Sequence, residues 1–223
     1  MFYTQLFFLC NLHSTLFFLW PLAIGFWTLV YHSSHRLPFI NFGGGMEHAE
    51  LERIFIEHGF ENFTWIYASD IEVAQWVRMK CTYGCGSYGK KATCPPNAPS
   101  FEECRRFFQD YGTGVLFHFR KKLEDPEKRD IYTRKINSGL LKVERDVFLS
   151  DYRKAFLFFM DECQLCEHCP GTLLECRNPR MARPSPESFC VDVFATVKKL
   201  GYPIEVLKDY DREMNRYAFL MVE

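Results

Sequence analysis

The stretch Cys163-Gln-Leu-Cys166-Glu-His-Cys169-Pro170, followed by Cys176, carries the strongest signal in this chain. Cysteines at Cys-x2-Cys-x2-Cys spacing require two tight turns, which can point all three sulfurs inward. Three converging thiolates suit one face of a [4Fe-4S] cluster, and Cys176 is the expected fourth ligand. Zinc is the alternative metal, although its four thiolates usually come from two separate Cys-x2-4-Cys pairs. Disulfides and free thiols are the remaining alternatives.

A second group of cysteines precedes the first by about seventy residues in a glycine-rich stretch. Its candidate metal ligands are Cys81, Cys85 and Cys94. Three thiolates would leave one metal position open for substrate, water or another ligand. The nearby Lys80, Lys90 and Lys91 would lower the thiol pKa values and favour the thiolate form. The alternative is an irregular loop whose buried, inert cysteines pack on the first group.

Composition narrows the class of protein. The 223 residues have a formal net charge of −1, from 27 Lys and Arg against 28 Asp and Glu, so no basic excess points to nucleic acid. The 10 cysteines are clustered at short spacings, which favours metal ligands over disulfides. Thiols that hold metal indicate a reducing compartment, so we expect the protein in the cytoplasm.

The first 45 residues differ from the rest and predict a separate N-terminal extension, followed by one metal-binding domain at residues 46–223. Residues 16–30 are almost entirely apolar, yet a membrane span needs about 20 such residues. The run Gly43-Gly44-Gly45 directly before Met46 is what a translated ribosome-binding site would produce, and it favours a natural start at Met46. The alternative is a genuine membrane anchor at residues 16–30, and contact with a membrane is expected only then.

Periodicity and capping signals predict an α+β fold with a mixed β-sheet of about five strands flanked by helices, and with the two cysteine-rich metal loops at one end. The expected strands are residues 63–67, 115–119, 154–160, 204–207 and 217–222, the last two closing a hairpin around residues 209–215. The expected helices are residues 47–58, 101–111 after the cap Ser100, 126–150 after the cap Asp125, and 186–200. Cys190 would lie in the first turns of the last helix, where the helix dipole favours a thiolate.

Taken together, the cysteine stretches resemble the DUF2284 family of predicted metal-binding proteins over nearly all of residues 47–223. The resemblance rests on Lys80-Cys81-x3-Cys85 to Cys94-Pro95-Pro96, Cys163-x2-Cys166-x2-Cys169, Cys176-Arg177-x-Pro179 and Ala182-Arg183-Pro184-Ser185. It implies seven metal ligands: Cys81, Cys85, Cys94, Cys163, Cys166, Cys169 and Cys176. This chain departs from the family at Asp161-Glu162, where small glycine-rich residues are expected, and at Cys190, where glycine is expected.

The arginines after Cys176 have two interpretations. Arg177 and Arg183 could offset the negative charge of a cluster or bind an anionic ligand, or they could belong to a solvated loop. We expect a [4Fe-4S] protein with a redox or electron-transfer role and a redox partner protein. The alternatives are a zinc-stabilised interaction module, or an enzyme with an open metal site at Cys81, Cys85 and Cys94.

Overall fold

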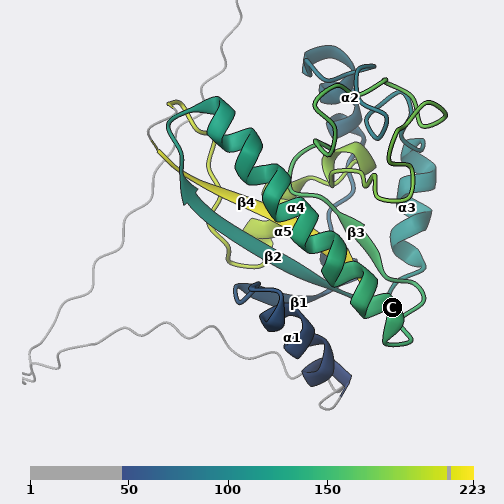
Figure 1. Ribbon diagram of the computed structural model, residues 1–223. Coiled ribbons are helices and arrows are strands. Elements are labelled where there is room, and N and C mark those ends of the chain that lie inside the picture. Colours follow the sequence, from purple (N-terminus) through teal and green to yellow (C-terminus); the bar gives the residue numbers. More distant parts are fainter. Residues whose placement is uncertain (1–46, 210–211) are drawn as a thin grey trace, which may run out of the picture. The chain divides into compact units, whose positions relative to one another are not determined.

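The computed structural model describes residues 47–209 and 212–223, which contain one four-stranded antiparallel sheet (Figure 1). The strands lie in the order β1-β2-β4-β3. Their bounds are β1 Phe63–Tyr67, β2 Thr113–Lys122, β3 Phe156–Phe158 and β4 Glu213–Met221. In the register, Trp65 lies opposite Val115, and Phe117 lies opposite Ala218. The long β4 therefore joins the pair β1-β2 to the short β3.

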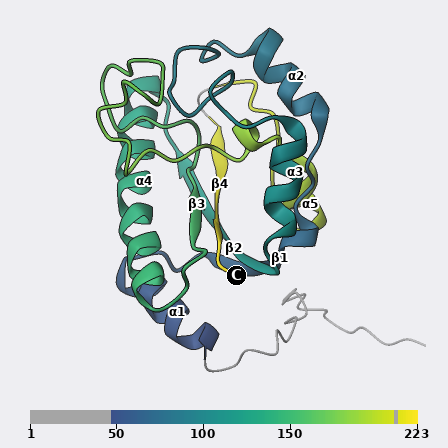
Figure 2. The same ribbon diagram turned by 90° about the vertical axis from the view of Figure 1, so that its right-hand side faces the viewer.

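Helices cover both faces of this sheet, so the fold has three layers (Figure 2). Side chains alternate along β2: Val115 and Phe117 face α1 (Glu47–Glu57) and α4 (Pro126–Leu149), while Leu116 faces α3 (Phe101–Gln109) and α5 (Val193–Lys199). Each face carries its own buried apolar cluster. The predicted α+β class is therefore confirmed for the described residues.

The predicted sheet was wrong in two respects. It is wholly antiparallel rather than mixed, and it has four strands among the described residues because 204–207 is not a strand. On the edge of β4 that faces away from β2, Phe219–Met221 already pair with β3, so these residues of the expected strand 217–222 are not available to 204–207. Part of the expected turn at 209–215 lies outside the described residues.

The helix starts follow the capping signals, with one exception. Ser100 and Glu103 form a complete capping box at α3, and Asp125 caps α4 with Pro126 in its first turn. The single helix expected at 186–200 is instead a 3-10 turn, Glu187–Phe189, followed by α5 with Asp192 as its N-cap. Cys190 lies between them in the left-handed region at φ 64°, so its expected place inside a helix was wrong.

The two cysteine stretches contact each other. The side chain of Asn97 donates to the carbonyl oxygen of Gly171 at 2.7 Å, and the amide of Ala92 donates to the sulfur of Cys169 at 3.3 Å. The first stretch is not wholly irregular, because Cys81 lies within α2 (Gln75–Gly84) and Cys85 follows at its C-cap. A 3-10 turn at Ala68–Asp70 links β1 to the segment before α2.

The N-terminal predictions are not addressed by this fold. Residues 1–45, with the candidate anchor at 16–30 and the proposed start at Met46, lie outside the described residues. Within residues 47–209 and 212–223, no helix combines the length and apolar character needed to cross a membrane.

Candidate metal centre

The end of β3 positions the first cysteine group. The side chain of Asn137, in the middle of α4, accepts from the amide of Met160 and donates to its carbonyl oxygen, both at 3.0 Å. Asn137 and Met160 are both buried. The next residue, Asp161, has a positive φ of 62°, which turns the chain away from the sheet toward Cys163.

Four thiols line one small cavity, which we call the four-thiol cavity. They are Cys163, Cys166, Cys169 and Cys176. All four are partly buried and none is in a disulfide. The structure therefore brings together the four cysteines that the spacing singled out, although metal binding by them stays a prediction.

Hydrogen-bond donors point at three of these sulfurs. The amide side chain of Asn178 donates to Cys166 Sγ at 3.0 Å, and the Ala92 amide donates to Cys169 Sγ. The backbone amides of Leu165 and Arg183 donate to Cys163 and lower its pKa, although burial raises that pKa by more. A sulfur that accepts an N–H hydrogen bond is suited to carry negative charge, as a metal-bound thiolate does.

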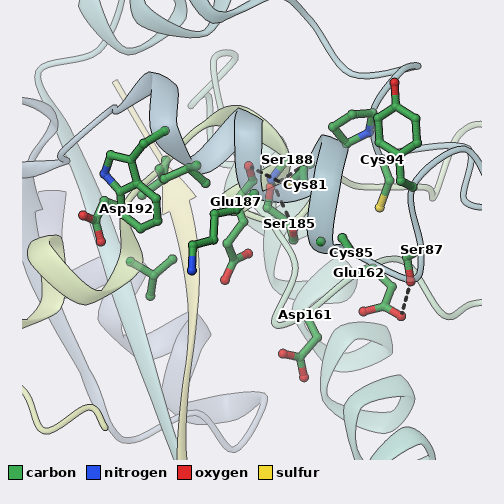
Figure 3. A pocket seen from close by; sticks show the side chains of 18 of the residues that line it. Cys81, Cys85, Ser87, Cys94, Asp161, Glu162, Ser185, Glu187, Ser188 and Asp192 are labelled. Atoms are coloured by element: carbon green, nitrogen blue, oxygen red, sulfur yellow. Dashed lines mark hydrogen bonds between the residues drawn. The ribbon is translucent and has the colours of Figure 1, made fainter. Parts of the chain in front are cut away.

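The second cysteine group lines a separate, larger pocket of about 760 Å³ (Figure 3). Cys81, Cys85 and Cys94 lie close enough for each of the first two to raise the pKa of Cys94 electrostatically. The structure therefore brings these three cysteines together as well. Whether they bind metal stays a prediction.

The expected lowering of thiol pKa values by lysines was wrong for two of these cysteines. Burial raises the pKa of Cys94 to about 12, with a further contribution from the charge of Glu162, and Lys91 offsets only part of this. Burial is also the main reason that the pKa of Cys81 is raised. Without a cation these thiols stay protonated, so a bound metal would have to displace the protons itself.

Carboxyl groups occupy the same pocket, which we call the acidic thiol pocket, and the sequence pattern did not predict them there. Asp161, Glu162, Glu187 and Asp192 line it (Figure 3). Among the described residues that line the pocket, the one cation is Lys80. Burial raises the pKa of Asp161. Glu187 keeps contact with solvent inside the pocket. Partial desolvation by the surrounding protein nevertheless raises its pKa, and the negative charge of Asp161 raises it further. The departure from the resembled family at Asp161-Glu162 was the only signal of these acids in the sequence.

The third group of thiols is a pair, Cys104 and Cys190, which is fully buried beside the guanidinium of Arg78. One Arg78 nitrogen, Nη2, donates to the carbonyl oxygens of Pro99 and Ser188 at 2.7 and 2.8 Å and lies 3.9 Å from Cys104 Sγ. Hydrogen bonds from Cys104 and Arg78 lower the pKa of Cys190, while that of Cys104 is raised. The sequence singled out Cys190 as a thiol in place of glycine and as a thiolate favoured by a helix dipole, but it did not predict the pairing with Cys104 or the contact with Arg78.

The two candidate arginines differ in their surroundings. Arg183 Nε donates to both oxygens of the buried Glu144, at 2.8 and 2.9 Å, so part of its guanidinium is occupied by an ion pair. Arg177 is exposed. Binding of a cofactor by either residue stays a prediction. In the described part of the chain, no group of three or more His, Cys, Asp or Glu side chains is arranged to hold a metal ion as it stands.

Comparison with known proteins identifies a single family. A family model described as a predicted metal-binding protein, DUF2284, matches residues 64–222. This range includes both cysteine groups and all four strands except the first residue of β1. No curated protein and no solved structure gives a significant match.

Proposed function

The chain belongs to the DUF2284 family of predicted metal-binding proteins, and from this premise we propose that its four-thiol cavity holds a [4Fe-4S] cluster with a redox or electron-transfer role. The observation that carries the proposal is the convergence of Cys163, Cys166, Cys169 and Cys176 on one cavity, with N–H donors directed at three of the sulfurs. Four thiolates are the usual ligand set of such a cluster.

The residues around the cavity have definable roles in this proposal. A bound cluster would supply reversible one-electron chemistry. Asn178 and the Ala92 amide would stabilise the negative charge on Cys166 and Cys169. Leu165, Pro170 and Ala182 form apolar walls that limit the access of water.

A second candidate function is favoured by the size of the acidic thiol pocket. At about 760 Å³ it falls within the range of small-molecule sites, and three thiols line it beside several carboxyl groups. A metal held by Cys81, Cys85 and Cys94 with one open position would make the protein an enzyme that acts on a small substrate. The alternative for the four-thiol cavity itself is a structural zinc ion.

The test is metal and sulfide analysis with an absorption spectrum, on protein started at Met46 and purified without oxygen. We expect about four iron atoms per chain and an absorption band at about 400 nm. Cys166→Ser should lose both signals, whereas the matched variant Cys85→Ser should keep them. If Cys85→Ser loses additional metal while the absorption persists, the second site exists. A colourless protein with stoichiometric zinc would refute the cluster.

A further inference from the structure

A basic groove lies beside the four-thiol cavity. It has a volume of about 660 Å³ and is lined by residues of α4 and of the segment after Cys176. Leu165 and Asn178 line both the groove and the cavity. Since Asn178 also donates to Cys166 Sγ at 3.0 Å, a molecule in the groove would be separated from a thiol by one side chain. Electron transfer weakens steeply with distance, so this is the kind of position from which an electron could pass.

The charge of the basic groove is strongly one-sided. Lys142, Arg145, Arg180 and Arg183 line it, and Glu144 is the one acid among the described residues that do so. Glu144 is buried and already bonded to Arg183 and to the amide of Leu157. The remaining three cations are exposed, and the whole chain has a net charge of only −1. The groove therefore concentrates positive charge and is suited to attract a negatively charged surface.

Large apolar side chains are exposed in the same groove. Phe148 is 52% exposed and Met181 is 48% exposed, and the neighbouring Leu149 is 63% exposed. Aromatic residues, methionine and arginine are the residue types enriched in protein–protein interfaces, where apolar anchors are surrounded by polar side chains. A small anion would use the cations but would leave these apolar side chains uncovered.

We propose that the basic groove docks a protein electron carrier with an acidic face. This inference rests on the proposed redox function, because the carrier would exchange one electron with the centre in the four-thiol cavity. The carrier loses the electron that the centre gains, or the reverse, and no bond forms or breaks. Phe148 and Met181 supply the apolar anchors, and Lys142, Arg145 and Arg180 orient the partner.

The test uses an acidic flavodoxin as the probe and isothermal titration calorimetry at low salt as the binding measurement. The groove variant is Lys142→Glu, Arg145→Glu and Arg180→Glu combined, and Arg183 is left unchanged because it pairs with the buried Glu144. The matched control reverses three exposed lysines outside the groove, Lys121→Glu, Lys128→Glu and Lys208→Glu, with the same change in net charge. A third variant, Phe148→Ser, removes an apolar anchor without changing the charge.

We expect the Kd to rise at least about tenfold in the groove variant and severalfold in Phe148→Ser, but much less in the control. Added salt should weaken binding by the native protein. The inference would be overturned if the groove variant and the control bound flavodoxin equally, or if the native protein showed no measurable binding. It would also be overturned if the groove variant lost binding to a polyanion such as heparin but kept its binding to flavodoxin. Iron content is measured in parallel. Absence of iron refutes the proposed function, while normal iron with unchanged binding refutes the docking site alone.

Discussion

At the residue scale, Arg78 connects three segments of the chain around the buried thiols of Cys104 and Cys190. Its side chain bonds to the carbonyl oxygens of Pro99 and Ser188 and lies beside Cys104 and Cys190. Its Nε has no hydrogen-bond partner in the part of the chain that the structure describes. A cation with a buried, unpaired nitrogen is stabilised by a nearby anion. Because the pKa of Cys190 is lowered, its thiolate is the candidate for this anion.

We therefore predict that Arg78→Met destabilises the protein and changes its pH dependence. Two carbonyl oxygens lose their donor, so the free energy of unfolding should fall by about 2–4 kcal/mol. Since the folded pKa of Cys190 lies below its ordinary value of 9.0, its thiolate contributes stability that is fully present above that value. This contribution is lost as the pH falls through the lowered pKa.

The measurement is denaturant unfolding between mildly acidic and mildly alkaline pH. The native protein should gain stability as the pH rises through the lowered pKa of Cys190, and Arg78→Met should gain much less. Lys121→Met, at an exposed site, serves as the control and should keep the native profile. Identical pH profiles for the native protein and Arg78→Met would contradict a thiolate at Cys190.

At the scale of elements, the critical junction is between α4 and β3. The strand has only three residues, and its end is held by the two hydrogen bonds of Asn137 with Met160 rather than by a further strand. Glu144, two turns further along α4, accepts from the amide of Leu157 at 2.9 Å. A rigid helix thus fixes the short strand from which the cysteine loop departs, and this arrangement defines the position of Cys163.

We predict that Asn137→Ala weakens both the fold and the candidate metal centre. The amide and the carbonyl oxygen of Met160 would be left buried without partners, which costs about 2–5 kcal/mol. Chemical denaturation measures this loss, and metal content after gel filtration reports on the cysteine loop. Ser138→Ala, one residue along on the exposed side of α4, should change both quantities little. Equal metal retention and equal stability in the two variants would show that Asn137 does not position the loop.

At the scale of the whole molecule, the described residues form one structure that requires α1 for its stability. The matched family region begins at residue 64, yet Leu51 and Phe55 of α1 are completely buried against β1, β2 and α4. Every residue of the two buried apolar clusters lies between Leu51 and Val222. We infer that the independent folding unit is longer than the matched region and begins before α1.

This leads to a prediction about truncation. A chain started at Met46 should unfold cooperatively and retain its metal, whereas a chain started at Glu61 should not fold stably. Removal of Leu51 and Phe55 alone costs about 5–10 kcal/mol at typical values for buried apolar side chains, a large share of the total stability of a domain. Circular dichroism during heating distinguishes the two chains. A cooperative transition at the same temperature in both would show that α1 is dispensable.

Local patterns were sufficient for part of this protein. The strand at 63–67, the capping box at Ser100 and the Asp125-Pro126 helix start are as predicted, because each depends on residues close in sequence. The two cysteine stretches together with their flanking residues, such as Pro95-Pro96 and Ala182-Arg183-Pro184-Ser185, were sufficient to identify the family, because such motifs are read directly from the sequence.

The tertiary structure decided what depends on distant residues. Strand pairing made the sheet antiparallel, and β3 rather than 204–207 pairs with Phe219–Met221 of β4, because a residue on a strand edge can pair with only one neighbouring strand. Burial raised the pKa values of Cys81 and Cys94 against the effect of neighbouring cations, since desolvation depends on packing rather than on sequence neighbours. The acidic thiol pocket and the basic groove likewise combine side chains from segments far apart in the chain, so their charges become visible only when the chain is folded.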